Sequence, residues 1–482
     1  MSKRLILVLA LVFAVGLTGA YAEVQNVKVS GDLTMKGVSR NDLDLNNTST
    51  TVVANDEQDS FLSIARVKID ADLTDNVSTT VRLINERDWD GDTNTTATGQ
   101  EIDIDLAYVN LKEFLYSPLS LTLGRQELRY GNALIVGDPD TNNLSTTSAL
   151  GAGANGSLGD LSLRKAFDSV KAVLNYDPLV VDLVYAKIAE ATITGSNAND
   201  DVNLYGVNAN YAMSSETTLE GYLFSKTRGS NSAGFTAAQR TAGALANAPT
   251  KHDSVHTVGG RAVNTSIKNL TAQAEAAFQF GSYNPAYDIN ANVGAENRQR
   301  EAWAAQVVAN YDLKDVLLTK YNPSVMGSYT YLSGEKNTRI QGGTYKGWDP
   351  MFEDQTLGHL INRIMGYTNA QIATLSGKVT PMEDVTLNVD YVTLWLNKGF
   401  PSDGGLDRRT NASNLRGVAG GAIYFMTEDK HLGQEVDATL TYDYTEDVQF
   451  SLLGGLFIPG DAFHKNNDNN ATELIGSMKV TF

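Results

Sequence analysis

Three aspartates at alternate positions are the residues of this chain whose types and spacing come nearest to a metal site. Asp88, Asp90 and Asp92 could offer carboxylate oxygens to a calcium ion. The helix–loop–helix calcium motif needs a glycine in sixth position and a glutamate in twelfth. Here the glycine is the fourth residue, Gly91, and Gly99 stands twelfth. The motif therefore fails, and calcium held in this loop stays an alternative to a simple solvated loop.

The sequence also contains no recognisable catalytic motif. The chain has no cysteine, which excludes thiolate nucleophiles, thiolate metal sites and disulfides. Its five histidines follow no metal-ligand spacing, and no serine-nucleophile, phosphate-binding or dinucleotide motif stands between a strand and a helix. A net charge of −18 opposes nucleic-acid binding. We expect no enzyme and no cofactor; a hydrolase with a dispersed Ser/His pair is the alternative.

Charged side chains recur at every second position in several segments. Arg66, Lys68, Asp70 and Asp72 alternate with apolar residues, and Asp103 and Asp105 follow the same spacing. Successive side chains of a strand point to opposite faces, so these charges share one face. The pattern predicts strands that are apolar on one side and polar on the other. The expected chemistry is electrostatic: opposed ladders of charge, Arg66 and Lys68 against the aspartates, that orient solutes in water.

This alternation continues to the end of the chain and predicts eighteen strands, many of them 10–13 residues long. A tilted strand needs about 9–11 residues to cross a bilayer, whereas sandwich strands usually have about 5–6. The pattern favours an all-β, transmembrane, antiparallel up-and-down barrel, with short periplasmic turns and long extracellular loops, over a secreted β-sandwich or β-helix. The expected strands are 26–38, 61–73, 77–87, 101–112, 118–130, 166–177, 178–188, 201–213, 217–227, 254–264, 269–280, 300–312, 322–334, 369–381, 383–397, 433–445, 446–458 and 470–482.

The first 22 residues have the organisation of a secretory signal peptide. Lys3 and Arg4 precede an apolar run over 5–17, and Ala20-Tyr21-Ala22 fits the small-x-small cleavage rule. The run is too short to cross a membrane as a helix, which takes about 20 residues. We therefore expect cleavage before Glu23, a single barrel domain over 23–482, and an outer-membrane location.

The polar face of such a barrel lines its interior. The charged residues expected there are nearly balanced, with twelve basic and thirteen acidic. The basic ones are Lys28, Lys36, Arg66, Lys68, Arg82, Lys171, Lys187, Lys226, Arg261, Arg300, Lys378 and Lys479. The acidic ones are Asp32, Asp70, Asp72, Glu86, Asp103, Asp105, Asp182, Glu220, Glu275, Asp390, Glu435, Asp437 and Asp443. Arg125 shares the parity of Leu123, which faces lipid. We expect a bulge at Gly124 to turn Arg125 into the lumen; the alternative is that the strand has already left the hydrocarbon layer.

One long loop is a candidate for a constriction. Residues 131–165 contain several glycines that let the backbone fold tightly, and Asp138 and Asp140 would place acidic groups in the opening. A mobile external loop is the equal alternative. The other long polar segments, including 335–368, are expected to be external loops.

Several short motifs resemble the alginate-export-type porin family. They are LGRQELRYG at 123–131, KAFDSV at 165–170, YTYLSGE at 329–335, WDPMF at 348–352, LGQEVD at 432–437 and PGD at 459–461. The matches follow one order over nearly the whole chain. The resemblance implies an 18-stranded outer-membrane barrel, and the terminal Phe482 resembles the closing strand that the outer-membrane assembly machinery reads.

The near balance of positive and negative charge on the expected lumen lining indicates which solutes the barrel would pass. Export of a polyuronate favours a lumen dominated by arginine and lysine. We therefore expect a porin for passive diffusion of small hydrophilic solutes or ions, general or moderately selective. The alternatives are a loop-mediated adhesin or receptor on a barrel scaffold, and an exporter of an alginate-like polysaccharide. The expected partners are outer-membrane lipid, the solutes and the assembly machinery.

Overall fold

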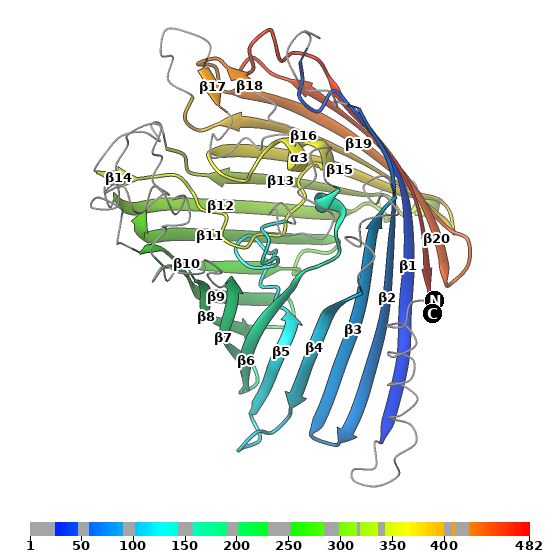
Figure 1. The fold of residues 1–482 in the computed structure, drawn as a ribbon, viewed down its shortest axis with the longest axis vertical. Coiled ribbons are helices and arrows are strands. Elements are labelled where there is room, and N and C mark those ends of the chain that lie inside the picture. The colour runs from blue at the N-terminus through cyan, green and yellow to red at the C-terminus, as the bar shows by residue number, and fades with distance from the viewer. Residues whose placement is uncertain are drawn as a thin grey trace, which may run out of the picture.

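Eighteen strands close into one antiparallel barrel (Figure 1). The computed structural model describes residues 25–46, 57–89, 102–142, 158–189, 201–229, 252–283, 298–315, 319–335, 343–399, 407–409 and 424–482. The barrel strands are β1 (Asn26–Asn41), β2 (Gln58–Thr74), β3 (Val77–Asp88), β4 (Asp103–Leu111), β5 (Leu119–Glu127), β6 (Ala166–Asn175), β7 (Leu179–Ala189), β8 (Val202–Ala212), β9 (Thr217–Arg228), β10 (Asp253–Asn264), β11 (Leu270–Tyr283), β12 (Arg298–Asp312), β13 (Ser324–Leu332), β15 (Ala370–Met382), β16 (Val385–Leu396), β19 (His431–Asp443), β20 (Val448–Pro459) and β21 (Ala471–Thr481).

Consecutive strands pair with each other, and β21 pairs with β1 to close the sheet. Each of the eighteen expected strands corresponds to one of these, so the predicted barrel is confirmed. Closure leaves no unpaired edge, which is what a sheet needs in order to lie in hydrocarbon. We call the end where β1 begins the turn end, because tight turns such as 75–76 lie there, and the opposite end the loop end.

Smaller elements lie between the barrel strands. The short strand β14 (Thr344–Tyr345) pairs in parallel with β12, and β17 (Asp407–Arg409) pairs with β18 (Tyr424–Met426). The helical segments in the described ranges are η1 (Gly159–Leu161), η3 (Thr319–Tyr321) and α3 (His359–Ile364). Within the part of the chain that the structure describes, no helix is long and apolar enough to cross a membrane.

The two faces of the sheet differ as the alternation predicts. Phe278 faces Trp303 across β11 and β12, and both side chains are exposed on the outer face. Glu275 and Gln279, at the other parity of β11, are buried. An apolar outer face and a polar inner face are the arrangement of a membrane barrel with an aqueous interior.

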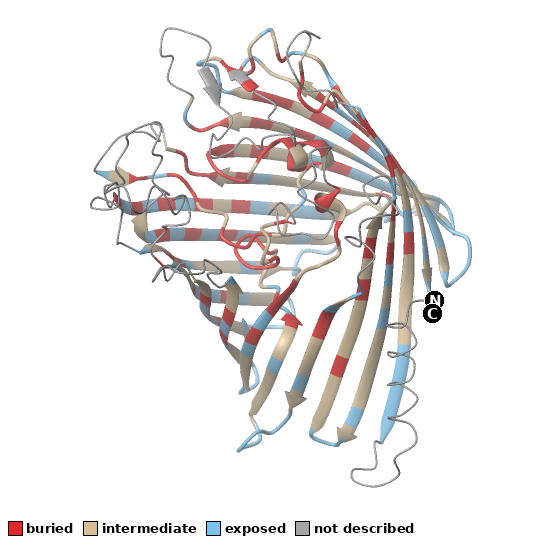
Figure 2. Ribbon diagram, in the orientation of Figure 1, coloured by how far each residue is buried: buried red, intermediate tan, exposed pale blue. Residues whose placement is uncertain are grey.

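The apolar core lies inside the barrel, toward the loop end. Buried residues gather on the loop-end parts of the strands and on segments between them, while the strand ends at the turn end are largely exposed (Figure 2). A barrel of this size would otherwise enclose water. The interior is therefore filled near one end and less filled near the other.

Candidate functional site

Charges near the turn end pair along the wall rather than across the lumen. Arg66 forms an ion pair with Asp32 at 2.9 Å on the neighbouring strand, and Lys68 with Asp70 at 2.9 Å on its own strand. Asp70 also accepts a hydrogen bond from Thr80 at 2.7 Å. Asp72 lies opposite Asn26 in the register. The structure thus joins Arg66 and Lys68 to adjacent carboxylates, whereas the alternating charges of the sequence predict separate opposed ladders.

Asp103 and Asp105 each bind a different arginine. Asp105 is buried and pairs with Arg82 at 2.5 Å, and Arg82 also pairs with Glu127. Asp103 is more exposed and pairs with Arg164 at 2.8 Å. Arg164 belongs to the connection between β5 and β6. These aspartates therefore anchor arginines, and one of those arginines comes from the candidate constriction loop.

Arg125 does not enter the lumen by a bulge. The pairing of β5 with β4 and with β6 continues through Gly124 without a register shift, although its φ is +123°. Arg125 lies opposite Asp168, two positions from the Leu123–Val170 pair, so it stays on the outer face. It forms an ion pair with Asp168 at 3.0 Å. The expected bulge was wrong: the strand is two residues from its end here, so the charge sits at the barrel rim.

Several other expected lining residues lie on the inner wall with local partners. Arg261 binds Glu220 at 3.2 Å and Gln273 at 2.8 Å, and Glu275 accepts a hydrogen bond from Tyr222 at 2.6 Å. Lys171 and Asp182 are close enough to interact electrostatically. Asp390 accepts a hydrogen bond from Asn388, and Asp443, near the turn end, accepts one from Gln449. Arg300 pairs with Asp253 and is described below.

The described parts of the 131–165 loop lie inside the barrel. We call residues 128–142 and 158–165 the first inserted segment. Leu158 is fully buried in an apolar cluster with lumen-facing Leu62, Ile64 and Ile84. Glu86 accepts hydrogen bonds from Ser162 at 2.9 Å and from the Leu163 N–H at 2.8 Å. This part of the segment is therefore packed and bonded to the wall formed by β2 and β3.

A buried arginine holds the same segment to the closing strands. Arg40 of β1 forms ion pairs with Asp160 of η1 at 2.6 Å and with Glu473 of β21. Its side chain is 1% exposed. Burial opposes ionisation of Asp160, but the charge of Arg40 outweighs it and lowers the pKa of that carboxyl. The two carboxylates and one guanidinium thus form a buried, charged anchor.

A second segment, 343–369, also enters the barrel, so the predicted external loop at 335–368 is wrong for this stretch. Phe352 forms a parallel bridge with Val136 of the first inserted segment. The Phe352 N–H donates to the Ile135 carbonyl at 3.0 Å, and the Asp138 N–H donates to the Phe352 carbonyl at 3.0 Å. The two segments therefore form one hydrogen-bonded crossbar within the lumen; we call this pairing the crossbar.

The second inserted segment is fixed to the wall at β19 through α3. Glu435 of β19 accepts the N–H groups of Leu360 at 2.8 Å and Ile361 at 2.6 Å, and Asp437 accepts that of His359 at 3.3 Å. These N–H groups have no partner inside the helix because they lie in its first turn. Glu435 and Asp437, expected as pore-lining residues, are therefore buried anchors for α3.

A shared carboxylate joins the two segments at the crossbar. Asp354 forms ion pairs with Arg129 and with Lys165, the latter at 3.0 Å. Lys165 also pairs with Asp138 at 2.6 Å, and Asp138 is fully buried and accepts the Asp140 N–H at 2.8 Å. Arg129 is the most exposed member, at 55%. Two cationic side chains and two carboxylates therefore lie together at the crossbar, and the arginine is the one most exposed to water.

The calcium candidate receives no support from the described residues. Asp88 accepts a hydrogen bond from Ser60, while Asp90 and Asp92 lie outside the described residues. Among the residues that the structure describes, no group of three or more metal-ligating side chains gathers. The signal peptide over 1–22 likewise lies outside the described residues.

The missed second segment did carry a signal in the sequence. Trp348, Met351 and Phe352, and then Leu360 and Ile361, make this connection unusually apolar for an external loop. All five side chains are buried in the structure. An apolar connection between two barrel strands needs a buried surface to pack on, and the barrel interior is the surface within its reach.

Comparison with known proteins agrees with this architecture. A family model described as alginate export matches residues 32–477. None of the curated proteins matches the sequence.

Three solved structures illustrate the likeness of fold. OccAB1 of Acinetobacter baumannii has a TM-score of 0.53 at 10% identity, covering 96% of this chain and 98% of that one. OccK3 (OpdO) of Pseudomonas aeruginosa gives 0.51 at 9% identity, covering 95% and 96%. OccK2 (OpdF) of the same organism, crystallised in complex with glucuronate, gives 0.51 at 10% identity, covering 96% and 100%. The barrel is of the outer-membrane porin type, and with its family match over nearly the whole length the chain belongs to the alginate export family.

Proposed function

We propose that the protein is a passive channel for small hydrophilic solutes or ions in the outer membrane. The observation that carries this proposal is a closed barrel whose inner face is polar and whose lumen is crossed by a hydrogen-bonded, charged crossbar. A lumen narrowed by fixed segments passes small solutes and excludes large ones. The exposed charges at the crossbar, Arg129 foremost, would then act on whatever passes.

The pairing of charges favours a general or moderately selective pore over a polysaccharide exporter. Arg66, Arg82 and Arg261 each hold a carboxylate partner on the wall. Paired charges leave little net potential along the lumen, whereas a polyanion would need an uncompensated basic path. OccK2, with its bound glucuronate, supplies a small sugar acid as a reasonable test solute. We assign the chain to transport rather than to catalysis or adhesion.

The C-terminal residue supports the proposed contact with the assembly machinery. The Phe482 N–H donates to the Gly31 carbonyl at 3.0 Å, and the Gly31 N–H donates to the Phe482 carbonyl at 2.8 Å. The Phe482 side chain is 68% exposed on the completed barrel. An exposed aromatic at the closing strand is accessible to a protein that recognises it before or during closure.

Single-channel conductance in a planar bilayer with a salt gradient tests the proposal. Open steps would support a pore, and folded protein without any conductance would favour the adhesin alternative. Asp103→Asn should shift the reversal potential toward anions, because Asp103 is exposed to the lumen beside Arg164. The matched control is Asp447→Asn in a turn between β19 and β20, which should leave the reversal potential unchanged.

A further inference from the structure

A cavity of about 450 Å³ lies between the crossbar and the wall formed by β7 to β12, at the loop end. Its lining comes from both inserted segments, at Pro139 and Pro350, and from the wall, at Ile188 and Val202. These four side chains are half-buried, so apolar surface remains accessible inside the cavity. Volumes of about 300–1,000 Å³ are those of small-molecule sites.

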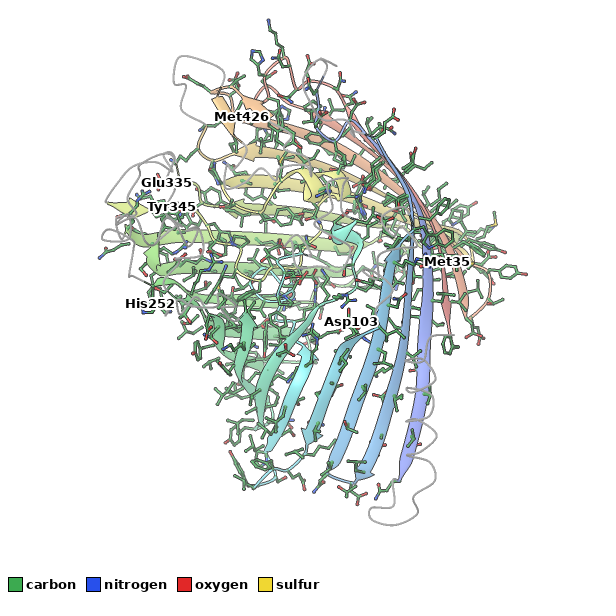
Figure 3. All side chains as sticks on the ribbon, in the orientation of Figure 1. Met35, Asp103, His252, Glu335, Tyr345 and Met426 are labelled. Carbon is green, nitrogen blue, oxygen red and sulfur yellow. The ribbon has the colours of Figure 1, made fainter. Side chains whose placement is uncertain are left out.

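An aromatic stack forms one side of this cavity. The rings of Tyr283 and Tyr345 stack with centroids 3.7 Å apart and planes inclined by 4°. The Arg300 guanidinium lies over the Tyr283 ring, 4.8 Å from its centroid. Tyr345 belongs to β14 and lies near the loop end of the barrel, where Glu335 also lies (Figure 3). The stack fixes this side of the cavity, because each ring is held by the other and by arginine.

Two of the three cations in the cavity are already neutralised. Lys226 pairs with Asp349 at 3.1 Å, and Arg300 pairs with Asp253 at 2.8 Å. Burial opposes ionisation of Asp349, but the charges of Lys226 and Arg300 outweigh it and lower its pKa to about 2. These four groups therefore carry no net charge near neutral pH.

The third cation, Arg228, is different. It is exposed and lines the same cavity, and its side chain has no hydrogen bond or ion pair with any residue that the structure describes. It ends β9, at the inward parity shared with Lys226. A guanidinium presents several donors in a planar fork that suits a carboxylate. Within the described ranges, the cavity therefore combines apolar walls with one cation that has no ion-pair partner.

We propose that this cavity binds a small organic monocarboxylate with an apolar or aromatic body. The carboxylate would accept hydrogen bonds from Arg228, and the body would lie against Ile188, Val202 and the two prolines. An inorganic anion would use the charge but not the apolar walls, and a neutral analogue would use the walls but not the charge. The inference rests on the proposed channel function, for which the cavity is a capture site on the loop-end side of the crossbar.

Calorimetric titration of the full-length protein in detergent tests this, with benzoate, the isosteric neutral benzamide and inorganic phosphate as probes. Benzoate should bind most tightly. Benzamide should bind about tenfold or more weakly, since a hydrogen bond to a charged group contributes that much. Phosphate should also bind about tenfold or more weakly, because it buries no apolar surface against the walls. Arg228→Gln should weaken benzoate binding about tenfold. Lys320→Gln, which removes the same charge from η3 far along the chain, should leave it unchanged.

Three results would overturn the inference: phosphate binding as tightly as benzoate, equal benzoate affinity in Arg228→Gln, or no benzoate binding by the folded protein. Heat-modifiable migration in gel electrophoresis shows that each variant has folded. If wild-type protein conducts but does not bind benzoate, the capture site fails and the channel stands. If it binds benzoate but never conducts, the channel fails instead.

Discussion

The two ends of this barrel use the same alternating strands to enclose different interiors. Near the turn end, Arg66 and Asp32 form a pair on the wall that is partly open to water. Near the loop end, lumen-facing Leu62 and Ile64 are fully buried under an inserted segment, and the nearby Arg40 is buried between two carboxylates. One strand pair, β1 and β2, carries both arrangements.

The difference shows how to interpret inward positions of a membrane strand. Inward polar residues predict water beside the wall, and inward apolar residues predict a chain segment packed against it. On β2 the change falls between Ile64 and Arg66. The inward residues of the strands, as well as the inserted segments, therefore determine at which height in the barrel the constriction lies.

The largest expected difference between the two ends concerns their ion pairs. Arg40→Ala would leave two carboxylates buried without a partner, which should cost about 3–5 kcal/mol of unfolding free energy. Arg66→Ala breaks a pair that water reaches, so it should cost about 1 kcal/mol or less. Urea unfolding of the two variants in detergent measures both values. Equal losses of unfolding free energy in the two variants would mean that the loop end and the turn end bury their ion pairs to the same extent.

A smaller difference is expected between a phenylalanine inside the barrel and one outside it. Phe352 packs edge-on against Phe167 with centroids 6.0 Å apart and is 2% exposed. Phe352→Ala should cost about 3 kcal/mol through the cavity it leaves at the crossbar. Phe278→Ala, on the outer face, should cost less because detergent or lipid can fill the space. Thermal unfolding compares the pair, and a larger loss for Phe278→Ala would place the core elsewhere.

The smallest expected effect depends on pH. The pKa of Asp349 lies at about 2 in the folded protein, below the usual 3.8. A lowered pKa adds stability that is complete above pH 3.8 and is lost as the pH falls through about 2, here roughly 2 kcal/mol. Asp349→Asn should therefore be less stable than wild type at pH 7, and the gap should narrow toward pH 2. A gap that stays constant with pH would contradict this.

The barrel could be predicted from sequence because its signal is local and repeated. Each strand shows its own period of two, and eighteen weak patterns support each other. The partners of the charges could not be predicted, because Arg40 meets Asp160 and Glu473 only after the chain has closed and an insert has packed. The entry of 343–369 was missed because a connection has no period, and only its apolar residues marked it.

Adjacent residues of β2 offer the most direct test of the central claim, that one face of the sheet meets lipid and the other meets water. Val67 is 40% exposed and the Lys68 side chain 36%, so exposure alone does not separate them. The chain has no cysteine of its own, so single substitutions can be labelled without background. In native membranes, Lys68→Cys should react with a charged, water-soluble thiol reagent, and Val67→Cys should react only with a lipid-soluble one. Equal reaction of both with the charged reagent would contradict the membrane barrel and the channel within it.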